Sequence, residues 1–282
     1  ADLVGVLPNI PIRPMGDRSV DEFNPPEHPV LAQDKVCYVG QPVAVVVAES
    51  SYLARDGAEL VDVDYEPLVP VINPELAIDP DTPKIHPNLG TNVAIRSVQR
   101  GGDIDQAFTQ ADHIVRQRYQ IPRLAPSPME PRGVVADYDP VTDLLTVWDS
   151  TQAPHQVQRY LAQSLNRPVE TIRVVAPDVG GSFGIKDCLF SEDILMPFLS
   201  LRLQRPVKWI EQRQENLLTY HGRGMRLDVE AAVKSDGKLL GIRANILADI
   251  GAYFYFTAPF PLFNAARRIT GPYDIPAVRA DI

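Results

Sequence analysis

A glycine-dense turn is the segment best suited to hold a ligand. It lies in the run VVAPDVGGSFGIK, residues 174–186, where a predicted strand leads into a turn at 180–184. Such a turn exposes backbone N–H groups and lets a ligand approach the main chain, which suits an anionic or oxo-bearing cofactor. The spacing matches neither the G-x-G-x-x-G of dinucleotide sites nor a Walker loop. A tight connection from strand to helix, without a ligand, is the alternative interpretation.

A second polar cluster is STQAPH, residues 150–155, where a predicted strand ends and a helix begins. The side-chain amide of Gln152 offers donors and an acceptor to a polar ligand. On these residues alone, the favoured interpretation is that Ser150 or Thr151 caps the helix. His155 is expected on the surface of the first helical turn.

The other polar candidates favour structural roles. The run MEPR, residues 129–132, could hold a charge pair, although a turn that enters a strand is the favoured interpretation. His221 lies in a predicted turn without metal-ligand spacing to the other histidines, and Asp249 ends a predicted strand. Cys37 and Cys188 form no C-x-x-C pair, so by themselves they cannot hold zinc or an iron–sulfur cluster.

The elements that must position these groups alternate between strands and helices. Helices are predicted at about 103–111, 154–166 and 191–203, and the second of them should pack through one face. That face contains Val157, Tyr160, Leu161 and Leu165. Strands are predicted at 114–121, 133–138, 144–150, 171–176, 206–211, 226–234 and 239–248.

The first 72 residues predict a smaller module. Its proline-rich start reads as an extended loop with at most short strands. Two β-rich runs, 36–38 and 42–48, predict a hairpin, and the alternation at 61–65 predicts a half-buried strand. Between them, a helix capped by Ser51 should run to about residue 60. Its packed side is expected to be Leu53, Ala54, Ala58 and Leu60.

A linker is predicted at 73–92, which is rich in proline and asparagine with little periodicity. It would separate the module 1–72 from a larger domain, 93–282. The order of strands and helices on both sides predicts the α+β fold class.

The composition is that of a folded, acidic protein. The chain has 282 residues, a formal net charge of −9 and 45% hydrophobic residues, which excludes global disorder. The acidic balance disfavours nucleic acid as a partner. No run approaches the ~20 apolar residues of a membrane span. The N-terminal residues show no signal-peptide pattern, so a cytoplasmic location is expected.

Ordered motifs along the chain resemble those of the xanthine oxidase/aldehyde oxidase family of molybdenum hydroxylases. The runs VCYVGQPVAVVVAES and DVDYEPLVPV resemble its α/β hammerhead module. MEPRGVVADYD, STQAPH, VGGSFGIK, PVKWIEQRQENL, YHGRGMRLDVE, ADIGAY and GPYDIP then follow in the order of its molybdopterin-binding large subunit. The resemblance covers about 36–276 and implies an enzyme that hydroxylates a carbon centre with oxygen from water.

The resemblance also assigns roles to single residues. Gln152 matches the family glutamine that approaches the oxo ligand of the molybdenum. Phe183 matches the phenylalanine of the G-G-x-F-G motif, whose backbone lies against the metal site. Asp187 falls where some purine-oxidising members carry a substrate-binding glutamate. The glycines that would let the backbone approach the cofactor are Gly180, Gly181 and Gly184.

The chain departs from the family pattern in two ways. Ser182 and Ile185 stand where the usual motif, GGGFGGK, has glycines. By the same resemblance, the chain begins partway through the hammerhead module and stops after GPYDIP, before the family's substrate loop and its glutamate base. No catalytic residue is therefore assigned within it, and the chain alone is expected to be inactive.

The resemblance implies a molybdenum–molybdopterin cofactor, with the cytosine dinucleotide form open, and [2Fe–2S] clusters and FAD on partner subunits or domains. The implied partners are the rest of the large subunit, the iron–sulfur and FAD subunits, and a small substrate, in a complex expected to dimerise. Aldehydes, N-heterocycles, purines and carbon monoxide stay open as substrates. Two other function classes stay open: a non-catalytic scaffold or assembly fragment of this fold, and an unrelated nucleotide-binding α/β enzyme.

Overall fold

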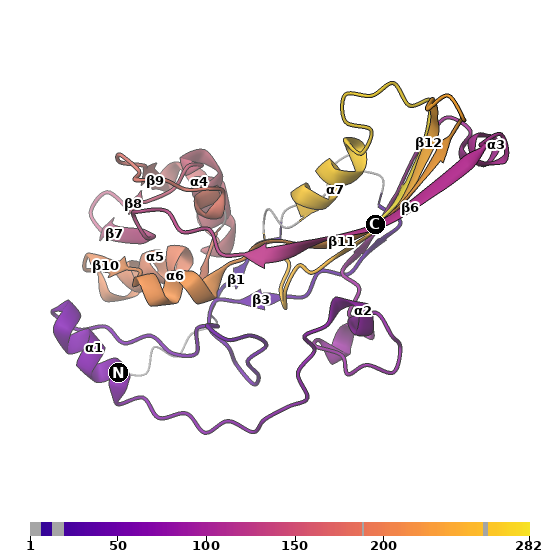
Figure 1. Ribbon diagram of the computed structural model, residues 1–282. Helices are drawn as coiled ribbons and strands as arrows, with labels where there is room; N and C mark the ends of the chain where they lie inside the picture. The colour runs from indigo at the N-terminus through magenta and orange to yellow at the C-terminus, as the bar shows by residue number, and fades with distance from the viewer. Residues whose placement is uncertain (1–6, 13–19, 188, 256–258) are drawn as a thin grey trace. The chain divides into compact units, whose positions relative to one another are not determined.

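The computed structural model describes residues 7–12, 20–187, 189–255 and 259–282, and it confirms the α+β class (Figure 1). The chain divides into two units, each assembled from separate stretches. The first unit comprises 1–11, 27–70 and 126–220, and the second comprises 12–26, 71–125 and 221–282.

The first unit is built on a four-stranded sheet of order β10-β7-β8-β9. Its strands are β7 (Gly133–Asp139), β8 (Leu144–Asp149), β9 (Ile172–Val175) and β10 (Val207–Ile210). β8 and β9 run parallel, because helix α4 (Pro154–Ser164) connects them as a crossover, whereas the other neighbours are antiparallel. Helix α5 (Ser191–Leu203) packs along β7 and β10.

Alternating apolar residues of these strands form the core of the first unit. Leu145 and Val147 of β8 are fully buried, and Val157 and Leu161 of α4 pack against the same cluster, which confirms part of the predicted helix face. The unit also contains the short strands β1 (Asn9–Ile10) and β3 (His28–Pro29) and the helices α1 (Ser51–Glu59) and α6 (Arg213–Thr219).

The second unit is built on a five-stranded sheet of order β5-β13-β12-β11-β6, in which only β12 and β13 pair in parallel among the described residues. Its strands are β5 (Val98–Gly101), β6 (His113–Leu124), β11 (Gly222–Val233), β12 (Leu239–Ala248) and β13 (Ala277–Asp281). Helix α7 (Pro259–Arg267) buries Leu262 and Phe263 against Ala244 and Ile246 of β12. The smaller elements are β2 (Glu22–Phe23), β4 (Ile95–Arg96), α2 (Pro74–Ala77), the 3₁₀ turn Pro87–Leu89 and α3 (Ile104–Thr109).

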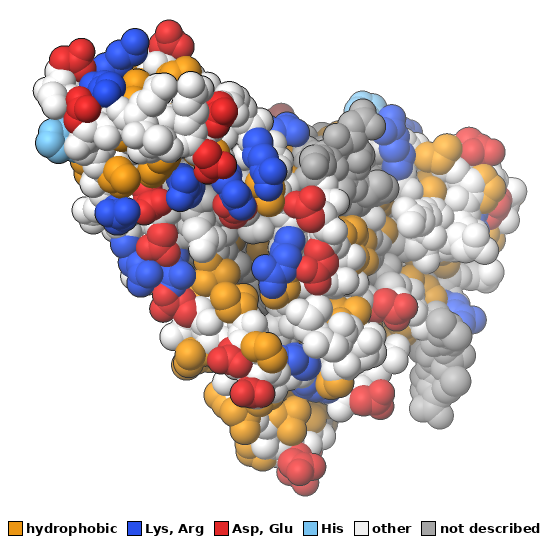
Figure 2. Space-filling model, turned by 90° about the vertical axis from the view of Figure 1, so that its right-hand side faces the viewer, with side chains coloured by type: hydrophobic (Ala, Val, Ile, Leu, Met, Phe, Trp, Pro, Cys, Tyr) orange, Lys and Arg blue, Asp and Glu red, His pale blue; other side chains and the backbone are white. Residues whose placement is uncertain are grey.

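Cross-strand ion pairs cover the solvent side of this sheet. Arg116 and Arg118 of β6 lie 2.6 Å from Glu230 and Asp228 of β11, respectively. Figure 2 shows acidic and basic side chains interspersed over the visible face.

The structure confirms the predicted elements of the larger domain and contradicts several in the N-terminal module. The helix at 51–59 exists, but Ser50, whose Oγ accepts a hydrogen bond from the backbone N–H of Leu53, is its cap in place of Ser51. The predicted packed side is wrong, since Leu53 and Leu60 are 55% and 85% exposed.

The predicted hairpin at 36–48 and the strand at 61–65 are also wrong, because both stretches lack strand pairing in the part of the chain that the structure describes. An alternating pattern shows which side chains would face a core, whereas a strand also needs a neighbour for its backbone hydrogen bonds. The stretch predicted as a linker, 73–92, contains α2 and the turn Pro87–Leu89, and the units divide after 70 and 125. The division at 73–92 stays a prediction.

Candidate functional site

The glycine-dense turn adopts a backbone conformation that ordinary residues avoid. It follows β9, and Gly181 and Gly184 have φ values of +96° and +92°. Phe183 between them has a φ of +54°, which is uncommon for a residue with a side chain. Unusual φ values of this kind concentrate at ligand-binding sites, where the surrounding structure enforces them.

The same turn presents its middle to solvent and buries its end. The Phe183 side chain is 79% exposed, whereas Ile185 and Lys186 are 0% and 2% exposed. Within the described part of the chain, the backbone N–H groups of Phe183 and Gly184 donate to no acceptor. The turn therefore exposes two N–H donors and an aromatic ring, while Ile185 and Lys186, which follow them, are buried.

Gln152 lies directly beside this turn. Its backbone N–H donates to the carbonyl oxygen of Lys186 at 3.1 Å, and Thr151 Oγ1 donates to the same oxygen at 3.0 Å. Ser182 Oγ donates to Gln152 Oε1 and accepts the backbone N–H of Lys186 at 3.2 Å. Because the amide oxygen is held in this way, the Gln152 amide nitrogen is left without an acceptor among the described residues.

The interpretation favoured from these residues alone, that Ser150 or Thr151 caps α4, is wrong. The cap residue is Ala153, which has no side-chain hydrogen bond, while Ser150 and Thr151 are buried. His155 is exposed in the first turn of α4, as predicted.

Asp187 lies at the end of the same turn and is partly buried. Its Oδ1 accepts a hydrogen bond of 3.3 Å from Gln156 Nε2 of α4. The structure therefore brings all the predicted site residues of the turn together with Gln152: Gly180, Gly181, Phe183, Gly184 and Asp187.

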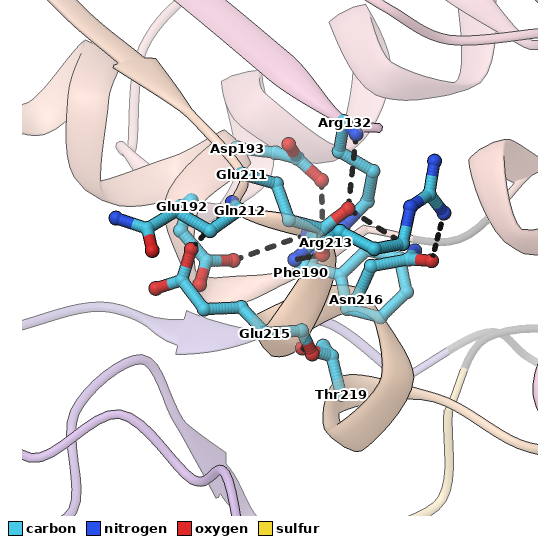
Figure 3. A network of polar contacts seen from close by, with 10 residues as sticks. All are labelled: Arg132, Phe190, Glu192, Asp193, Glu211, Gln212, Arg213, Glu215, Asn216 and Thr219. Atoms are coloured by element: carbon cyan, nitrogen blue, oxygen red, sulfur yellow. Dashed lines mark hydrogen bonds and ion pairs between the residues drawn. The ribbon is translucent and has the colours of Figure 1, made fainter. Parts of the chain in front are cut away.

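A buried ionic network supports this region, and sequence reasoning found only its MEPR segment (Figure 3). Arg132, whose side chain is 3% exposed, lies 2.8 Å from Glu211, which is fully buried, and 3.1 Å from Glu192. Asn216 of α6 donates to Glu211 Oε2 at 3.1 Å. The charge pair allowed for at 129–132 thus exists, with partners about 60 and 80 positions away that no local pattern predicts.

Burial and charge act against each other on the titratable groups of this network. Burial opposes the charge of Arg132, yet Glu192, Asp193 and Glu211 raise its pKa above the usual value. Burial raises the pKa of Asp193 to about 7, although Arg132 partly opposes this. Burial also raises the pKa of Asp149, and the charge of Asp193 adds to the effect.

The second unit contains a separate polar cluster. Arg123 Nη2 lies 2.5 Å from His221 Nε2, and Arg123 Nε lies 3.2 Å from Asp249, which agrees with a structural role for Asp249. Within the described ranges, the side chains of His, Cys, Asp and Glu form no group of three that could hold a metal ion. Cys37 is partly buried, and Cys188 lies outside the described residues.

Two family matches cover most of the chain. Residues 85–282 match the molybdopterin cofactor-binding domain, and residues 7–69 match the a/b hammerhead domain of aldehyde oxidase and xanthine dehydrogenase. The chain belongs to this family of molybdenum hydroxylases. The predicted family is thereby confirmed.

Curated relatives agree with this assignment. The chain is 39% identical to the 6-hydroxypseudooxynicotine dehydrogenase complex subunit gamma of Paenarthrobacter nicotinovorans, over 94% of this chain and 33% of that protein. It is 41% identical to the nicotine 6-hydroxylase large subunit of the same organism, over 88% of this chain and 31% of that protein. The chain thus spans about a third of the length of these relatives.

Solved structures of molybdenum hydroxylases share the fold. Quinoline 2-oxidoreductase from Pseudomonas putida 86 superposes with a TM-score of 0.84 at 35% identity, over 93% of this chain and 34% of that one. Like these relatives, the chain combines a hammerhead segment with a molybdopterin-binding domain. In the described residues, each helix is too short or too polar to cross a lipid bilayer.

The residues at the glycine turn fit a molybdopterin cofactor. Two unused N–H donors, an unused amide nitrogen at Gln152 and main chain exposed at Gly181 and Gly184 suit a ligand rich in oxygen and negative charge. Ser182, one of the two departures from the usual motif, contributes to this fit because its hydroxyl orients the amide of Gln152.

Proposed function

We propose that this chain forms the part of a molybdenum hydroxylase that holds the molybdopterin cofactor at the turn 180–184. The observation that carries the proposal is the meeting of the Gln152 amide with the exposed turn around Phe183. Both groups present hydrogen-bond donors toward solvent, and Ile185 at the end of the turn is fully buried and anchors it. Such fixed donors stabilise a charged or oxo-bearing ligand without reorganising when it binds.

The division of tasks follows from the contacts. The bound cofactor supplies the redox chemistry that hydroxylates carbon with oxygen from water. The amide nitrogen of Gln152 would donate a hydrogen bond to the cofactor, and the N–H groups of Phe183 and Gly184 would hold it in position. Asp187, oriented by Gln156, contributes to the substrate side. The catalytic base is assigned to a part of the large subunit other than this chain.

We place the substrate among aromatic N-heterocycles, with aldehydes as the second choice. Two similar proteins, nicotine 6-hydroxylase and quinoline 2-oxidoreductase, are named for N-heterocyclic substrates, and this similarity supports the choice. The complete enzyme would pass electrons to [2Fe–2S] clusters and FAD on partner subunits, as a dimeric complex in the cytoplasm. Its cofactor would be the molybdopterin or its cytosine dinucleotide.

Oxygen labelling tests this function. The native complex that contains this chain is incubated with an N-heterocycle such as quinoline and an artificial electron acceptor in H₂¹⁸O. Incorporation of ¹⁸O into the hydroxylated product supports the proposal. Label drawn instead from ¹⁸O₂ contradicts the proposal. Absence of any turnover with N-heterocycles, aldehydes or carbon monoxide also contradicts it, and that result favours a non-catalytic scaffold.

A further inference from the structure

Glu130 lies where the glycine turn meets the buried ionic network. Its Oε2 accepts the backbone N–H of Gly180 at 2.5 Å and the ammonium of Lys186 at 2.9 Å. The backbone N–H of Glu130 in turn donates to the carbonyl oxygen of Gly180 at 3.2 Å. One side chain therefore holds both ends of the cofactor turn.

The contact between Glu130 and the turn is close enough to require glycine. A Cβ added at position 180 would lie 2.7 Å from Glu130 Cβ, nearer than real Cβ contacts occur. The φ of Gly180 lies outside the left-handed region, so the approach of Glu130 is the reason for this glycine. The turn and the Glu130 segment are thus fitted to each other.

Glu130 is itself held in place by the network beneath it. Arg213 donates to the carbonyl oxygens of Pro128 and Met129, the latter at 3.1 Å, and its Nη1 bonds Asn216 Oδ1 at 2.6 Å. Two residues after Glu130, the buried Arg132 is joined to Glu211. The segment that presents Glu130 is consequently fixed from both sides.

The carboxylate form is the one that these contacts favour. Burial alone would raise the pKa of Glu130, but hydrogen bonds from Lys186 and Gly180 outweigh burial and lower it. Lys186 has a fully buried side chain, so its ammonium depends on the oxygen of Glu130 for hydrogen bonding.

We propose that Glu130 is a positioning residue that holds the turn 180–184 in its cofactor-binding conformation. It acts through its hydrogen bond to Gly180 and its pairing with Lys186, and it does not touch the reacting atoms. The inference deepens the proposed function and rests on it, because the conformation matters only if the turn binds the cofactor.

The test compares Glu130→Ala and Glu130→Gln in the complete enzyme, with Asp139→Ala as the matched control. Asp139 also accepts a backbone N–H, from Val141 at 2.9 Å, but in an exposed turn between β7 and β8. Five quantities are measured: hydrogen exchange of the peptide covering 178–187, molybdenum content, kcat, KM and the Mo(V) electron paramagnetic resonance spectrum.

We expect Glu130→Ala to speed exchange at 178–187 at least tenfold and to lower kcat at least tenfold, with KM changed less than threefold. Its molybdenum content should match wild type, and its Mo(V) signal should shift. Glu130→Gln keeps an oxygen for the N–H of Gly180 but loses the charge that pairs with Lys186. Its exchange rate and kcat should therefore lie between those of wild type and Glu130→Ala, whereas Asp139→Ala should stay within threefold of wild type.

The inference is overturned if Glu130→Ala exchanges and turns over like wild type. It is also overturned if Glu130→Gln loses as much kcat as Glu130→Ala. If Glu130→Ala does not accumulate, Glu130→Asp, which is one methylene too short, must show the faster local exchange or the inference fails. Molybdenum and pterin missing from the wild-type complex would instead contradict the proposed function, while the exchange comparison still tests the role of Glu130.

Discussion

The oxygen and the nitrogen of the Gln152 side-chain amide differ in their contacts. The oxygen is bound by Ser182, and this contact leaves the nitrogen with its donors unused by the described chain. Since an amide whose oxygen is hydrogen-bonded has a fixed orientation, the structure presents a donor and not an acceptor on the free side of this amide. The serine that departs from the family motif is what sets this orientation.

Replacing Gln152 tests whether that donor acts in turnover. We expect Gln152→Ala in the complete enzyme to lower kcat at least about tenfold, because removal of one preorganised donor from a charged transition state costs a factor of this size or more. Molybdenum and pterin contents should stay at the wild-type level. His155→Ala, exposed two residues into α4, is the control and should leave kcat unchanged. Loss of the pterin itself would show that Gln152 serves assembly.

His221 makes folding sensitive to acid. Burial, and then the charge of Arg123, lowers the pKa of His221 from 6.5 to about 4. The folded state thus favours neutral His221, so its contribution to stability is complete above pH 6.5 and is lost as pH falls toward 4. Thermal unfolding from pH 8 to 4 should show a smaller loss of Tm for His221→Asn than for wild type. Parallel pH profiles of the two proteins would contradict this.

At the scale of elements, local patterns predicted most strands and helices of the two sheets, whereas β5, β13 and α7 were not predicted. The alternation in β7 and β8 and the apolar face of α4 matched their buried residues. The run at 42–48 has an equally strong pattern but no strand neighbour in the described chain. Helix α6 was missed although it has a local signal, because Glu215 Oε2 accepts the backbone N–H of Gln212 at its start, at 2.7 Å. The fully buried Asn216 then fixes its packing.

The candidate site was predictable where it is local. The turn 180–184 and Gln152 belong to two short motifs, and glycine spacing and an amide at a strand end identify them. Glu211 and Glu130 could not be assigned from spacing, because their partners lie 79 and 56 positions away. Their roles depend on β7, β10 and the turn meeting in the folded unit.

The buried pair of Arg132 and Glu211 should dominate the stability of the first unit. We expect Glu211→Ala to lower the free energy of unfolding by about 3–5 kcal/mol, because it leaves a buried guanidinium without its main partner. Asp143→Asn, which breaks an ion pair in the same unit with Asp143 58% exposed, should cost less than about 1 kcal/mol. Both tryptophans, Trp148 and Trp209, lie in this unit, so denaturation followed by fluorescence reports on it. Equal losses in the two variants would contradict the assignment.

At the scale of the whole molecule, the chain represents about a third of its curated relatives. Its two units carry the matched hammerhead and molybdopterin-binding segments, and the residues assigned to cofactor contact lie in the first unit. Under the proposed function, these residues hold and orient the cofactor, and the catalytic base is contributed by another part of the large subunit.

A direct consequence is that the isolated 282-residue chain should be inactive. Purified residues 1–282, supplied with cofactor and an electron acceptor, should hydroxylate no substrate, while the complete complex does so under the same conditions. Turnover by the isolated chain would show that the base lies within it.

The most direct test of the account is the molybdenum and released-pterin content of the native complex that co-purifies with this chain. We predict about one molybdenum and one pterin per large subunit, in cells that make the cofactor. A complex with neither molybdenum nor pterin, isolated from such cells, would leave the fold standing and contradict the assignment of the turn 180–184 as a cofactor site.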